Sequence, residues 1–416
     1  MTPSPSRVAS IMLSWHSLEL VSCSTLQTLW AGYGHICAIS ARATTSEAAA
    51  HLAQLCGVDS KGAGGTYPLI LKLISPPSKK ARTEDEGHLR KMLSYEVEQC
   101  FYSEVVPRLG DEIGVAKCLA STRDMAGRPG EDELRGLMAT VMVDLRPAYP
   151  VAGGKRSSLS STQVRAALDW LAGFHGRSRA LLPGSRDELV LPPLEEAKRR
   201  QSRNEKGGRG LWLNGGYTYL ATRRKEYASL VDDTDSEWSE ALCSAPEGFS
   251  LSVAEMVALV LTPSGRPIES YIHGDVKSEN LFTSASGEWV AFFDFQYVGL
   301  GLGVCDLAKL FTCSVPLEML VEDENYLPEQ LPMQHGERSL LEAYRAALLQ
   351  EQESDVYPWE TFRRHWETAL VDWCRFQASW GFWGNTEWLE ARVRSILGDQ
   401  GWRDWLYQEV SFRSGS

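Results

Sequence analysis

Residues 273–283 read His-Gly-Asp-Val-Lys-Ser-Glu-Asn-Leu-Phe-Thr, residues 291–296 read Ala-Phe-Phe-Asp-Phe-Gln, and these two stretches decide the fold. Leu281–Thr283 is a short apolar run, Ser284–Gly287 has the residue types of a turn, and Glu288–Phe293 is aromatic and β-branched. Short apolar runs on either side of a polar turn are typical of a β-hairpin. The sequence therefore predicts a strand-turn-strand unit here.

Three oxygen-bearing side chains, Asp275, Asn280 and Asp294, flank this predicted hairpin. Folding it back brings Asn280 and Asp294 to one end of the ladder, with Asp275 just before it. Asp275 and Asn280 have the H-x-D-x-x-x-x-N spacing of a phosphotransferase catalytic loop, and Asp294 opens an Asp-Phe-x sequence. Transfer of the γ-phosphoryl group of Mg-ATP needs oxygen ligands for Mg²⁺ and a carboxylate that accepts the proton of the incoming hydroxyl. The alternative is a polar hairpin whose Asp and Asn side chains only cap turns.

Two details of these motifs resemble the aminoglycoside phosphotransferase and choline kinase group. They are Gly274 within His-Gly-Asp, and Gln296 in place of the last glycine of Asp-Phe-Gly. Within that group, the chain is most similar to the ecdysteroid-kinase-like branch. The resemblance runs from about Leu26 to about Trp388, and it is most specific in the catalytic segment.

The resemblance implies both a fold and an activity. The implied fold is α+β, protein-kinase-like and bilobal. Residues 1–144 would form an N-terminal nucleotide-binding lobe built on an antiparallel sheet, and residues 145–416 a larger, mainly helical lobe for catalysis and acceptor binding. The implied activity is transfer of a phosphoryl group from ATP, with Mg²⁺, to a hydroxyl of a small-molecule acceptor. Asp275 would then act on the acceptor proton, while Asn280 and Asp294 would hold the metal.

Two glycines mark a turn near the start of this similarity. The stretch Leu26–Ala41 is predicted to form two strands joined by Ala-Gly-Tyr-Gly, which contains Gly32 and Gly34. Glycines at such a place allow backbone N–H groups to approach phosphates closely. Taken alone, the pattern fits an ordinary hairpin turn equally well.

A lysine stands in the middle of the apolar run Leu69–Ile74, where a charge needs a partner. The following helix, predicted over His88–Leu109, offers one. In the resembling kinases a strand lysine binds the α- and β-phosphates while a helix glutamate fixes its ammonium. Lys72 is the strand lysine here. Glu98 is preferred over Glu96 as its partner because it matches the family pattern Glu-x-x-Phe-Tyr, although either glutamate could be a solvated surface carboxylate.

The last strands of the N-terminal lobe are predicted at Val115–Ala120 and Leu137–Val143. The chain then leaves through Asp-Leu-Arg-Pro, where proline stops the strand. In the resembling kinases adenine lies along this connector, so Met142, Val143 and Leu145 are candidates for the adenine pocket. Core packing explains the same three residues equally well.

In the second lobe, a helix is predicted over Ser160–His175, with His175 as a structural histidine. Glu195–Gly210 is charged and is predicted to be a mobile surface loop. The long insert that precedes the catalytic loop is expected to shape the acceptor pocket. Asp306 resembles the buried aspartate that braces the catalytic loop from below, and a supporting role is predicted for it.

Four tryptophans recur every seven residues near the C-terminus, which places them on nearly one face of a helix: Trp359, Trp366, Trp373 and Trp380. They could form an aromatic wall for a cationic or ring-shaped acceptor. Burial in the core is favoured, because large aromatic side chains are usually packing residues.

Composition agrees with a soluble enzyme. The 416 residues are 43% hydrophobic and carry a net charge of −12 without an offsetting basic stripe, which argues against nucleic-acid binding. Nine scattered cysteines without a C-x-x-C pair indicate free thiols in a reducing compartment. No signal peptide, membrane span or obligate protein partner is predicted, and the expected location is cytoplasmic.

Two other functions compete with the small-molecule kinase. A protein kinase is disfavoured because only eleven residues separate Asp294 from Asp306, too few for a phosphorylatable activation loop. A pseudokinase that only binds a partner is disfavoured because it has no chemical reason to keep the whole set of Lys72, Glu98, Asp275, Asn280 and Asp294.

Overall fold

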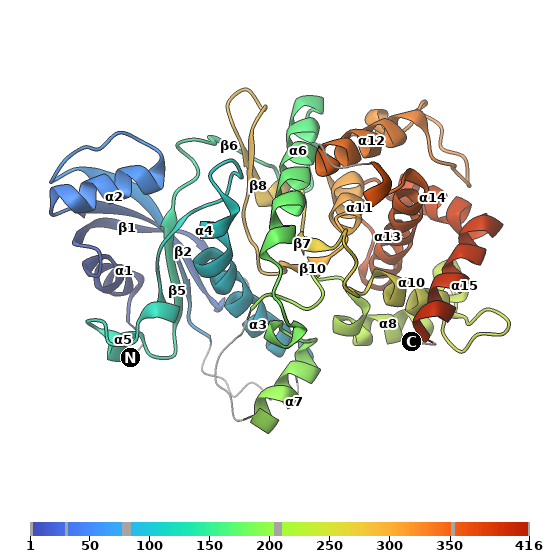
Figure 1. The fold of residues 1–416 in the computed structure, drawn as a ribbon, viewed down its shortest axis with the longest axis horizontal. Helices are drawn as coiled ribbons and strands as arrows, with labels where there is room; N and C mark the ends of the chain where they lie inside the picture. The colour runs from blue at the N-terminus through green and yellow to red at the C-terminus, as the bar shows by residue number, and fades with distance from the viewer. Residues whose placement is uncertain (1–2, 30–31, 77–84, 204–209, 351–353, 415–416) are drawn as a thin grey trace.

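The computed structural model describes residues 3–29, 32–76, 85–203, 210–350 and 354–414. Figure 1 shows an antiparallel sheet at one end of the molecule and a large group of helices at the other. The predicted α+β class is confirmed, because the sheet comes from N-terminal residues and the C-terminal part is mainly helical.

Five strands form the N-terminal sheet in the order β1-β2-β3-β5-β4, with every neighbouring pair antiparallel. They are β1 (Leu18–Thr28), β2 (Gly34–Ala43), β3 (Thr66–Ile74), β4 (Cys118–Ser121) and β5 (Met138–Val143). The first strand begins at Leu18 and not near Leu26 as predicted. β1 lies at the edge of the sheet and leaves most of its side chains exposed, so its sequence lacks the apolar alternation that marks a strand.

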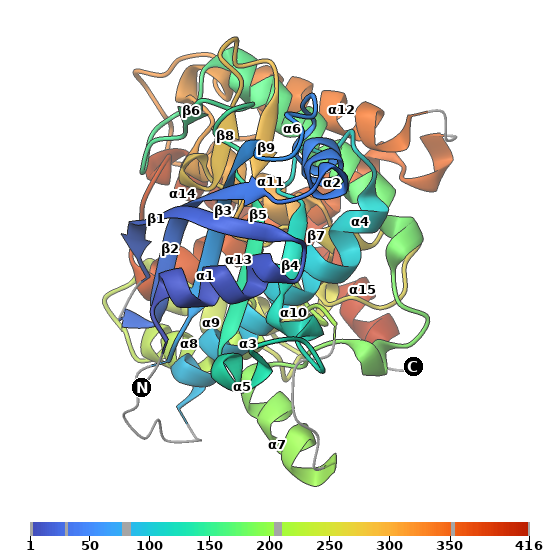
Figure 2. The same cartoon turned by 90° about the vertical axis from the view of Figure 1, so that its left-hand side faces the viewer.

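The two faces of the sheet contact different parts of the molecule, as the side chains of β3 show. Leu69, Leu71 and Leu73 point to one face and are buried beneath α1 (Pro5–Ser14) and α2 (Ser46–Cys56). Figure 2 shows these two helices beside the strands. Because successive strand residues alternate in direction, Ile70 and Lys72 point the other way, towards the helical part.

A long helical segment connects β3 to the rest of the sheet. It consists of α3 (Glu86–Cys100), a π-helical turn (Phe101–Val105) and α4 (Val106–Leu109). This agrees with the helix predicted over residues 88–109. The short helix α5 (Glu131–Leu134) precedes β5. Val97 and Phe101 are buried in the main core of the molecule, so the segment joins the sheet to the helical part.

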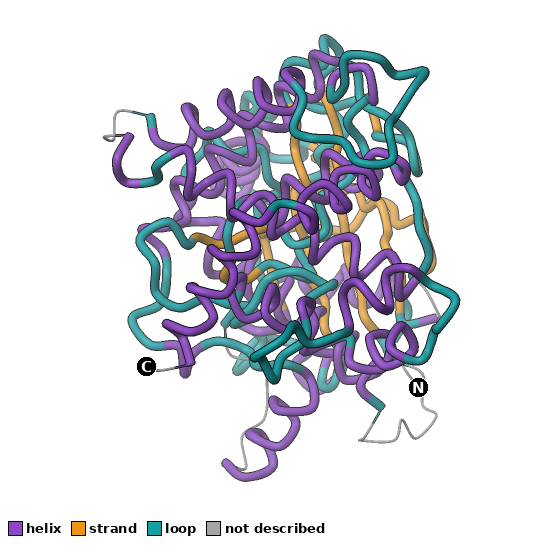
Figure 3. The backbone as a smooth tube through the Cα atoms, turned by 90° about the vertical axis from the view of Figure 1, so that its right-hand side faces the viewer, coloured by secondary structure: helices purple, strands orange, loops and turns teal. Residues whose placement is uncertain are grey.

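Ten α-helices lie in the described part of the chain after residue 144, and Figure 3 shows this part from the other end of the molecule. They are α6 (Ser161–Ser178), α7 (Pro193–Arg203), α8 (Arg224–Val231), α9 (Glu237–Cys243), α10 (Val253–Leu261), α11 (Val304–Cys313), α12 (His335–Leu349), α13 (Trp359–Trp380), α14 (Thr386–Gly398) and α15 (Gln400–Ser414). α6 matches the predicted helix. It begins with a capping box, in which the Ser160 hydroxyl accepts a hydrogen bond from the backbone N–H of Gln163 at 3.3 Å, and the Gln163 side chain accepts one from the backbone N–H of Ser160 at 2.8 Å.

The hairpin that the sequence predicted is present as β8 (Leu281–Thr283) and β9 (Val290–Phe292). Leu281 lies opposite Phe292 in the ladder, and β6 (Val151–Ala152) adds a third strand beside β8. A separate pair, β7 (Ser270–Ile272) and β10 (Gly299–Gly301), brackets the segment. The backbone around residues 273–280 is therefore held from both sides by strand pairing.

The tryptophans of α13 divide between core and surface. Trp366 and Trp373 are buried, and the indole N–H of Trp366 donates to Glu337 at 2.8 Å. Trp359 is partly buried, while Trp380, at the end of the helix, is 57% exposed. The packing interpretation therefore holds for the middle of α13 and not for its C-terminal end. Arg375 is buried, and it donates to Asp372 at 2.9 Å and to the backbone oxygen of Thr218 at 2.6 Å.

The loop predicted at Glu195–Gly210 is wrong for its first half. Residues up to Arg203 belong to α7, and residues 204–209 lie outside the described part of the chain. Glu196 stabilises this helix by accepting a hydrogen bond from the backbone N–H of Leu191 at 3.0 Å and by pairing with Arg200 at 2.8 Å. Such partners hold a charged segment in a helix although its composition suggests a loop. Within the described ranges, no helix has the length and apolar character needed to cross a membrane.

Candidate active site

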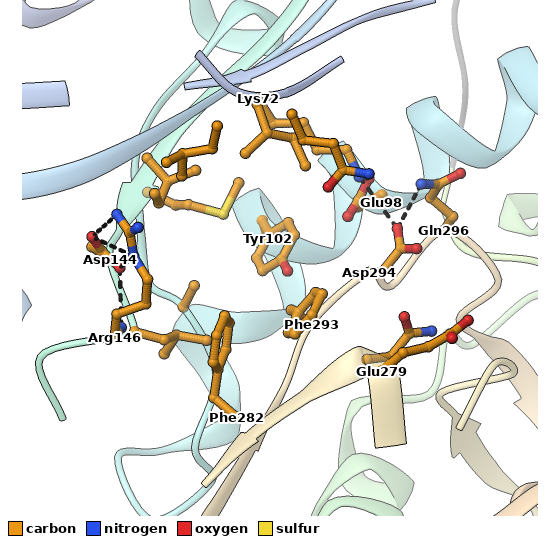
Figure 4. A pocket seen from close by; sticks show the side chains of 18 of the residues that line it. Lys72, Glu98, Tyr102, Asp144, Arg146, Glu279, Phe282, Phe293, Asp294 and Gln296 are labelled. Atoms are coloured by element: carbon orange, nitrogen blue, oxygen red, sulfur yellow. Dashed lines mark hydrogen bonds and ion pairs between the residues drawn. The ribbon is translucent and has the colours of Figure 1, made fainter. Parts of the chain in front are cut away.

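A cavity of about 600 Å³ lies between the N-terminal sheet and the β8–β9 hairpin, and Figure 4 shows it closely. Seven of the residues predicted for the site line it: Lys72, Glu98, Met142, Val143, Leu145, Asn280 and Asp294. Asp275, Gly32 and Gly34 are not among its lining residues. The cavity thus gathers residues from β3, α3, β5 and the hairpin.

Lys72 lies at the centre of an ion-pair network at one end of this cavity. Its Nζ is 2.5 Å from Glu98 Oε2 and 3.3 Å from Asp294 Oδ1. Burial alone would lower the pKa of Lys72, but the two carboxylates outweigh burial, so its pKa is raised and the ammonium stays charged. Glu96, the alternative partner, pairs instead with Arg200 at 2.9 Å. Of the two glutamates considered, only Glu98 meets the strand lysine.

Asp294 is held in an unusual backbone conformation. Its φ is 67°, in the left-handed region that asparagine and aspartate tolerate better than other side chains. Its Oδ1 accepts hydrogen bonds from Lys72 at 3.3 Å and from the Gln296 amide at 2.5 Å. Burial would raise the pKa of Asp294, but Lys72 and the Gln296 hydrogen bond lower it, so the group is a carboxylate. Both bonds use the same oxygen, which leaves Oδ2 without a hydrogen-bond partner in the described ranges.

Asp275 and Asn280 are joined within the loop that precedes β8. The Asn280 Nδ2 donates to the backbone oxygen of Asp275 and to its Oδ2, both at 2.9 Å. Lys277 also contacts Asp275 Oδ2, at 3.1 Å. The Asp275 carboxylate is therefore fixed in position by two donors, as a proton acceptor in a reaction must be.

The oxygens of Asn280 and Asp294 suit a Mg²⁺ ion. Because Nδ2 of Asn280 is used by Asp275, its amide oxygen is the group left to bind a ligand. The backbone N–H of Phe293 donates to the backbone oxygen of Asn280 at 3.0 Å, so Asp294 follows directly beyond this pairing. Carboxylate and amide oxygens are the hard ligands that Mg²⁺ prefers. The residues present thus fit the metal.

Asp306 supports this loop from below. It is fully buried, and its two oxygens accept hydrogen bonds from the backbone N–H groups of His273 at 2.7 Å and of Gly274 at 2.9 Å. His175 contacts the same carboxylate at 3.1 Å, although 131 positions separate the two in the sequence. Lys309 donates to the backbone oxygen of Gly274 at 2.7 Å. This geometry agrees with the supporting roles predicted for Asp306 and His175.

The glycine turn between β1 and β2 lies close to α3. Gly32 has φ 72° and Gly34 has φ 155°, and a side chain at Gly34 would collide with the backbone oxygen of Leu73. The hydroxyl of Tyr33, between them, is 2.6 Å from His88 Nδ1 at the start of α3. The turn is thereby connected to the helix that carries Glu98.

Apolar side chains form the other end of the cavity. Met142, Val143 and Leu145 line it together with further apolar residues from the sheet and the hairpin: Ile36, Ile70, Ala116, Phe282 and Phe293. Asp144 does not point freely into this space, because Arg146 binds both of its carboxylate oxygens, at 2.6 to 3.1 Å. An apolar part of the cavity therefore lies beside the connector.

Comparison with protein families decides where the chain belongs. Residues 59–330 match the model of the ecdysteroid kinase-like family. This protein is a member of that family. The match covers β3, α3, the hairpin and Asp306, which are the elements that build the site. No curated protein sequence matches the chain.

Several solved structures are similar to this ecdysteroid kinase-like protein. A macrolide 2'-phosphotransferase from Brachybacterium faecium is 14% identical, with 98% of each chain covered and a TM-score of 0.41. A choline kinase from Cryptosporidium parvum is 13% identical, covering 93% of this chain and 88% of that one, with a TM-score of 0.38. A Plasmodium vivax ethanolamine kinase is 9% identical, covering 93% and 84%, with a TM-score of 0.38.

Two residues of this family member were missed at the sequence level. Lys277 contacts Asp275 and Glu279, each at 3.1 Å, and these carboxylates raise the pKa of its ammonium against the effect of burial. Gln296, noted only as a motif letter, donates to Asp294 and accepts from the Ser94 hydroxyl at 3.1 Å. The sequence feature that could have identified Lys277 as a site residue is its position two residues after Asp275.

His273 in this ecdysteroid kinase-like protein is expected to make stability depend on pH. The backbone N–H of Asp275 donates to its Nδ1 at 3.2 Å, so the proton is on Nε2, which donates to the backbone oxygen of Phe293 at 3.0 Å. Burial lowers the pKa of His273 below its ordinary value of 6.5. The folded protein therefore holds this ring neutral, while the unfolded chain takes up a proton as the pH falls below 6.5.

The free energy of unfolding should accordingly fall with pH below 6.5, by about 1.4 kcal/mol per pH unit from this one group, down to its lowered pKa. Above pH 6.5 the contribution of His273 to the free energy of unfolding no longer changes with pH. Urea unfolding at several pH values, compared between the natural protein and a His273→Asn variant, isolates it from the other histidines. Equal pH slopes for the two proteins would contradict the assignment.

Proposed function

We propose that this protein is an ATP- and Mg²⁺-dependent phosphotransferase that moves the γ-phosphoryl group to a hydroxyl of a small molecule. The observation that carries the proposal is that Lys72, Glu98 and Asp294 form one ion-pair network in the cavity that Asn280 also lines. Membership of the ecdysteroid kinase-like family supports the small-molecule kinase class. A buried lysine between two carboxylates, beside an amide oxygen that is free to bind, provides the groups that a phosphate and a metal need.

The N-terminal side of the cavity would bind the nucleotide. The slot beside Met142, Val143 and Leu145 would receive adenine. Lys72, fixed by Glu98, would bind the α- and β-phosphates, and the turn with Gly32 and Gly34 would cover them. In this proposal residues 1–144 act as the nucleotide-binding lobe and residues 145–416 as the catalytic and acceptor-binding lobe.

Asn280 and Asp294 would hold Mg²⁺ through the amide oxygen and the unused carboxylate oxygen described above. The metal, when bound, neutralises charge on the β- and γ-phosphates. Asp275 would accept the proton of the acceptor hydroxyl, because its carboxylate is fixed by Asn280 and Lys277 at 2.9 and 3.1 Å. The protein contributes positioning and charge rather than covalent chemistry, as phosphoryl transfer requires.

The direct test is thermal unfolding with ATP in the presence and absence of Mg²⁺. A ligand at 100 times its dissociation constant stabilises the folded state by about 2.7 kcal/mol, and we expect most of that gain only when both ATP and Mg²⁺ are present. The same samples, incubated with a library of alcohols, should release ADP. Binding without turnover of any acceptor would favour the pseudokinase, and no nucleotide-dependent shift would contradict the proposal.

A further inference from the structure

A second cavity adjoins the nucleotide cavity on the side of the catalytic loop. Its volume is about 320 Å³, within the range of sites for small molecules. Lys155, Lys277 and Glu279 line both cavities, so the two spaces meet at these residues. Lys277 also binds Asp275 at 3.1 Å. Asp275 itself lines neither cavity, so a molecule in the second cavity would reach it beside Lys277, at the place where the second cavity meets the first.

Aromatic rings form one wall of the second cavity: Tyr217, Trp380, Phe382 and Trp383. Trp380 is 57% exposed and Phe382 is 36% exposed, which is unusual for such large apolar side chains. Both lie at the end of α13 and in the turn that follows it. Rings left open to solvent at a cavity wall are suited to stack on a ring of a bound molecule.

A cation of the protein itself already uses the ring faces of this wall. The guanidinium carbon of Arg223 is 4.9 Å from the ring centre of Tyr217 and 5.4 Å from that of Trp380. It also lies 5.5 Å from Phe376 behind the wall, and Arg223 is buried. Glu226 balances its charge at 3.1 Å. Two of the four rings of the wall, Tyr217 and Trp380, thus already make a cation–π contact within the protein.

The second cavity is also lined by positively charged side chains. Lys155, Arg156 and Lys277 line it, against the single carboxylate of Glu279. Glu279 is already paired with Lys277 at 3.1 Å. Lys155 and Arg156 are exposed and make no ion pair within the described ranges, so both are free to pair with an anionic group of a bound molecule.

The segment that carries Lys155 and Arg156 is fixed on the catalytic loop. The backbone N–H of Gly153 donates to the backbone oxygen of Leu281 at 3.0 Å, and the Ser278 hydroxyl donates to the backbone oxygen of Gly154 at 2.9 Å. Gly153 lies so close to Ser278 that a side chain there would collide with its backbone oxygen. Arg156 has φ 54°, a left-handed conformation that is costly for arginine. Hydrogen bonds to the catalytic loop therefore fix the backbone that places Lys155 and Arg156 at the second cavity.

We propose that the second cavity is the acceptor site and that the acceptor is a hydroxylated ring compound that also carries an acidic group. The ring would stack on Trp380 and Phe382, and the acidic group would bind Arg156 and Lys155. This inference rests on the proposed phosphotransferase function. In the reaction the hydroxyl oxygen bonds to the γ-phosphorus, the bond to the β–γ bridging oxygen breaks with ADP leaving, and the hydroxyl proton passes to Asp275.

Matched acceptors that differ only in charge test this inference. 4-(Hydroxymethyl)benzoate, 4-methylbenzyl alcohol and 4-(aminomethyl)benzyl alcohol share one ring and one reacting hydroxyl, and larger ring systems can be compared in the same three charge classes. With ATP and Mg²⁺ present, release of ADP and formation of the phosphate ester are measured for each. We expect kcat/KM to be highest for the acids and lowest for the amines.

A charge reversal at Arg156 sharpens the test. Arg156→Glu should lower kcat/KM for the acids by about tenfold or more, mainly through KM, and should raise it for the amines. Arg156→Gly removes the charge and accepts the left-handed backbone without strain, so it should show the loss without the gain. The matched control is Lys198→Glu, which reverses an exposed charge on α7, at the bottom of the molecule in Figure 1. This control variant should leave kcat/KM unchanged for both the acids and the amines.

The possible failures are distinguishable. Faster transfer to the amines or to the neutral alcohols than to the acids would overturn the inference about the acceptor and leave the phosphotransferase function intact. An unchanged preference in Arg156→Glu would overturn it as well. Transfer to no compound of any charge class would contradict the proposed function itself, and the acceptor inference with it.

Discussion

Phosphoryl transfer by an Asp275→Asn variant should be slower than that of the natural protein by about 10² to 10⁴, the usual contribution of a general base. Asparagine has nearly the same shape, and the Asn280 hydrogen bond to the backbone oxygen at residue 275 does not depend on the side chain. The variant loses the carboxylate that accepts the acceptor proton. ATP binding should change little, because Asp275 does not line the nucleotide cavity.

Single-turnover kinetics with an acceptor from the screen, together with titration of ATP binding, separate these two effects. Asp404→Asn on α15 is the matched control, since Asp404 is exposed and far along the chain from the catalytic segment. It should leave the rate unchanged. Full activity of Asp275→Asn with every accepted compound would show that another group takes the proton.

Asp294→Asn should remove the dependence of nucleotide binding on Mg²⁺ and lower kcat by at least about 10², the scale of a lost electrostatic contact at the reacting phosphate. Asparagine tolerates the left-handed backbone found at this position, with φ 67°, so the variant should fold. It lacks the negative charge that binds the metal and that also faces Lys72 at 3.3 Å. The loss should therefore appear in the metal-dependent part of binding.

The measurement is the shift of the unfolding temperature with ATP alone and with ATP at increasing Mg²⁺. The shift with ATP alone serves as the internal control, because the adenine slot and the Lys72–Glu98 pair are untouched by the substitution. If the variant gained the same stabilisation from Mg²⁺ as the natural protein, Asp294 would not be a metal ligand.

Local features of this protein were predictable from sequence because their partners are close along the chain or are demanded by simple energetics. The β8–β9 hairpin follows from two apolar runs and a turn, and it places Asn280 and Asp294 at the same end. A lysine inside the apolar strand β3 requires a carboxylate, which made Lys72 and Glu98 a natural pair. Asp275 was visible through its spacing from Asn280.

Features that depend on distant partners could not be found in this way. α7 is held by Glu196 and its contacts with Leu191 and Arg200, which composition does not reveal. The sequence left the tryptophans of α13 between a cation-binding wall and a core stripe. The structure buries Trp366, as favoured, whereas Trp380 is exposed and lies 5.4 Å from the guanidinium of Arg223; the wall for an acceptor stays a prediction. Arg223 and Trp380 lie far apart in the sequence, and no sequence pattern predicts that they are in contact.

The guanidinium of Arg223 behind the rings of Tyr217 and Trp380 has a practical consequence for chemical probes of this protein. An inhibitor that placed a quaternary nitrogen on the ring faces used by Arg223 would compete with a buried side chain that Glu226 and the backbone oxygen of Tyr217 hold in place, at 3.1 and 2.6 Å. Under the proposed acceptor assignment, aryl carboxylates would meet Arg156, Lys155 and the exposed rings of Trp380 and Phe382, and they are the fragments to test first as blockers.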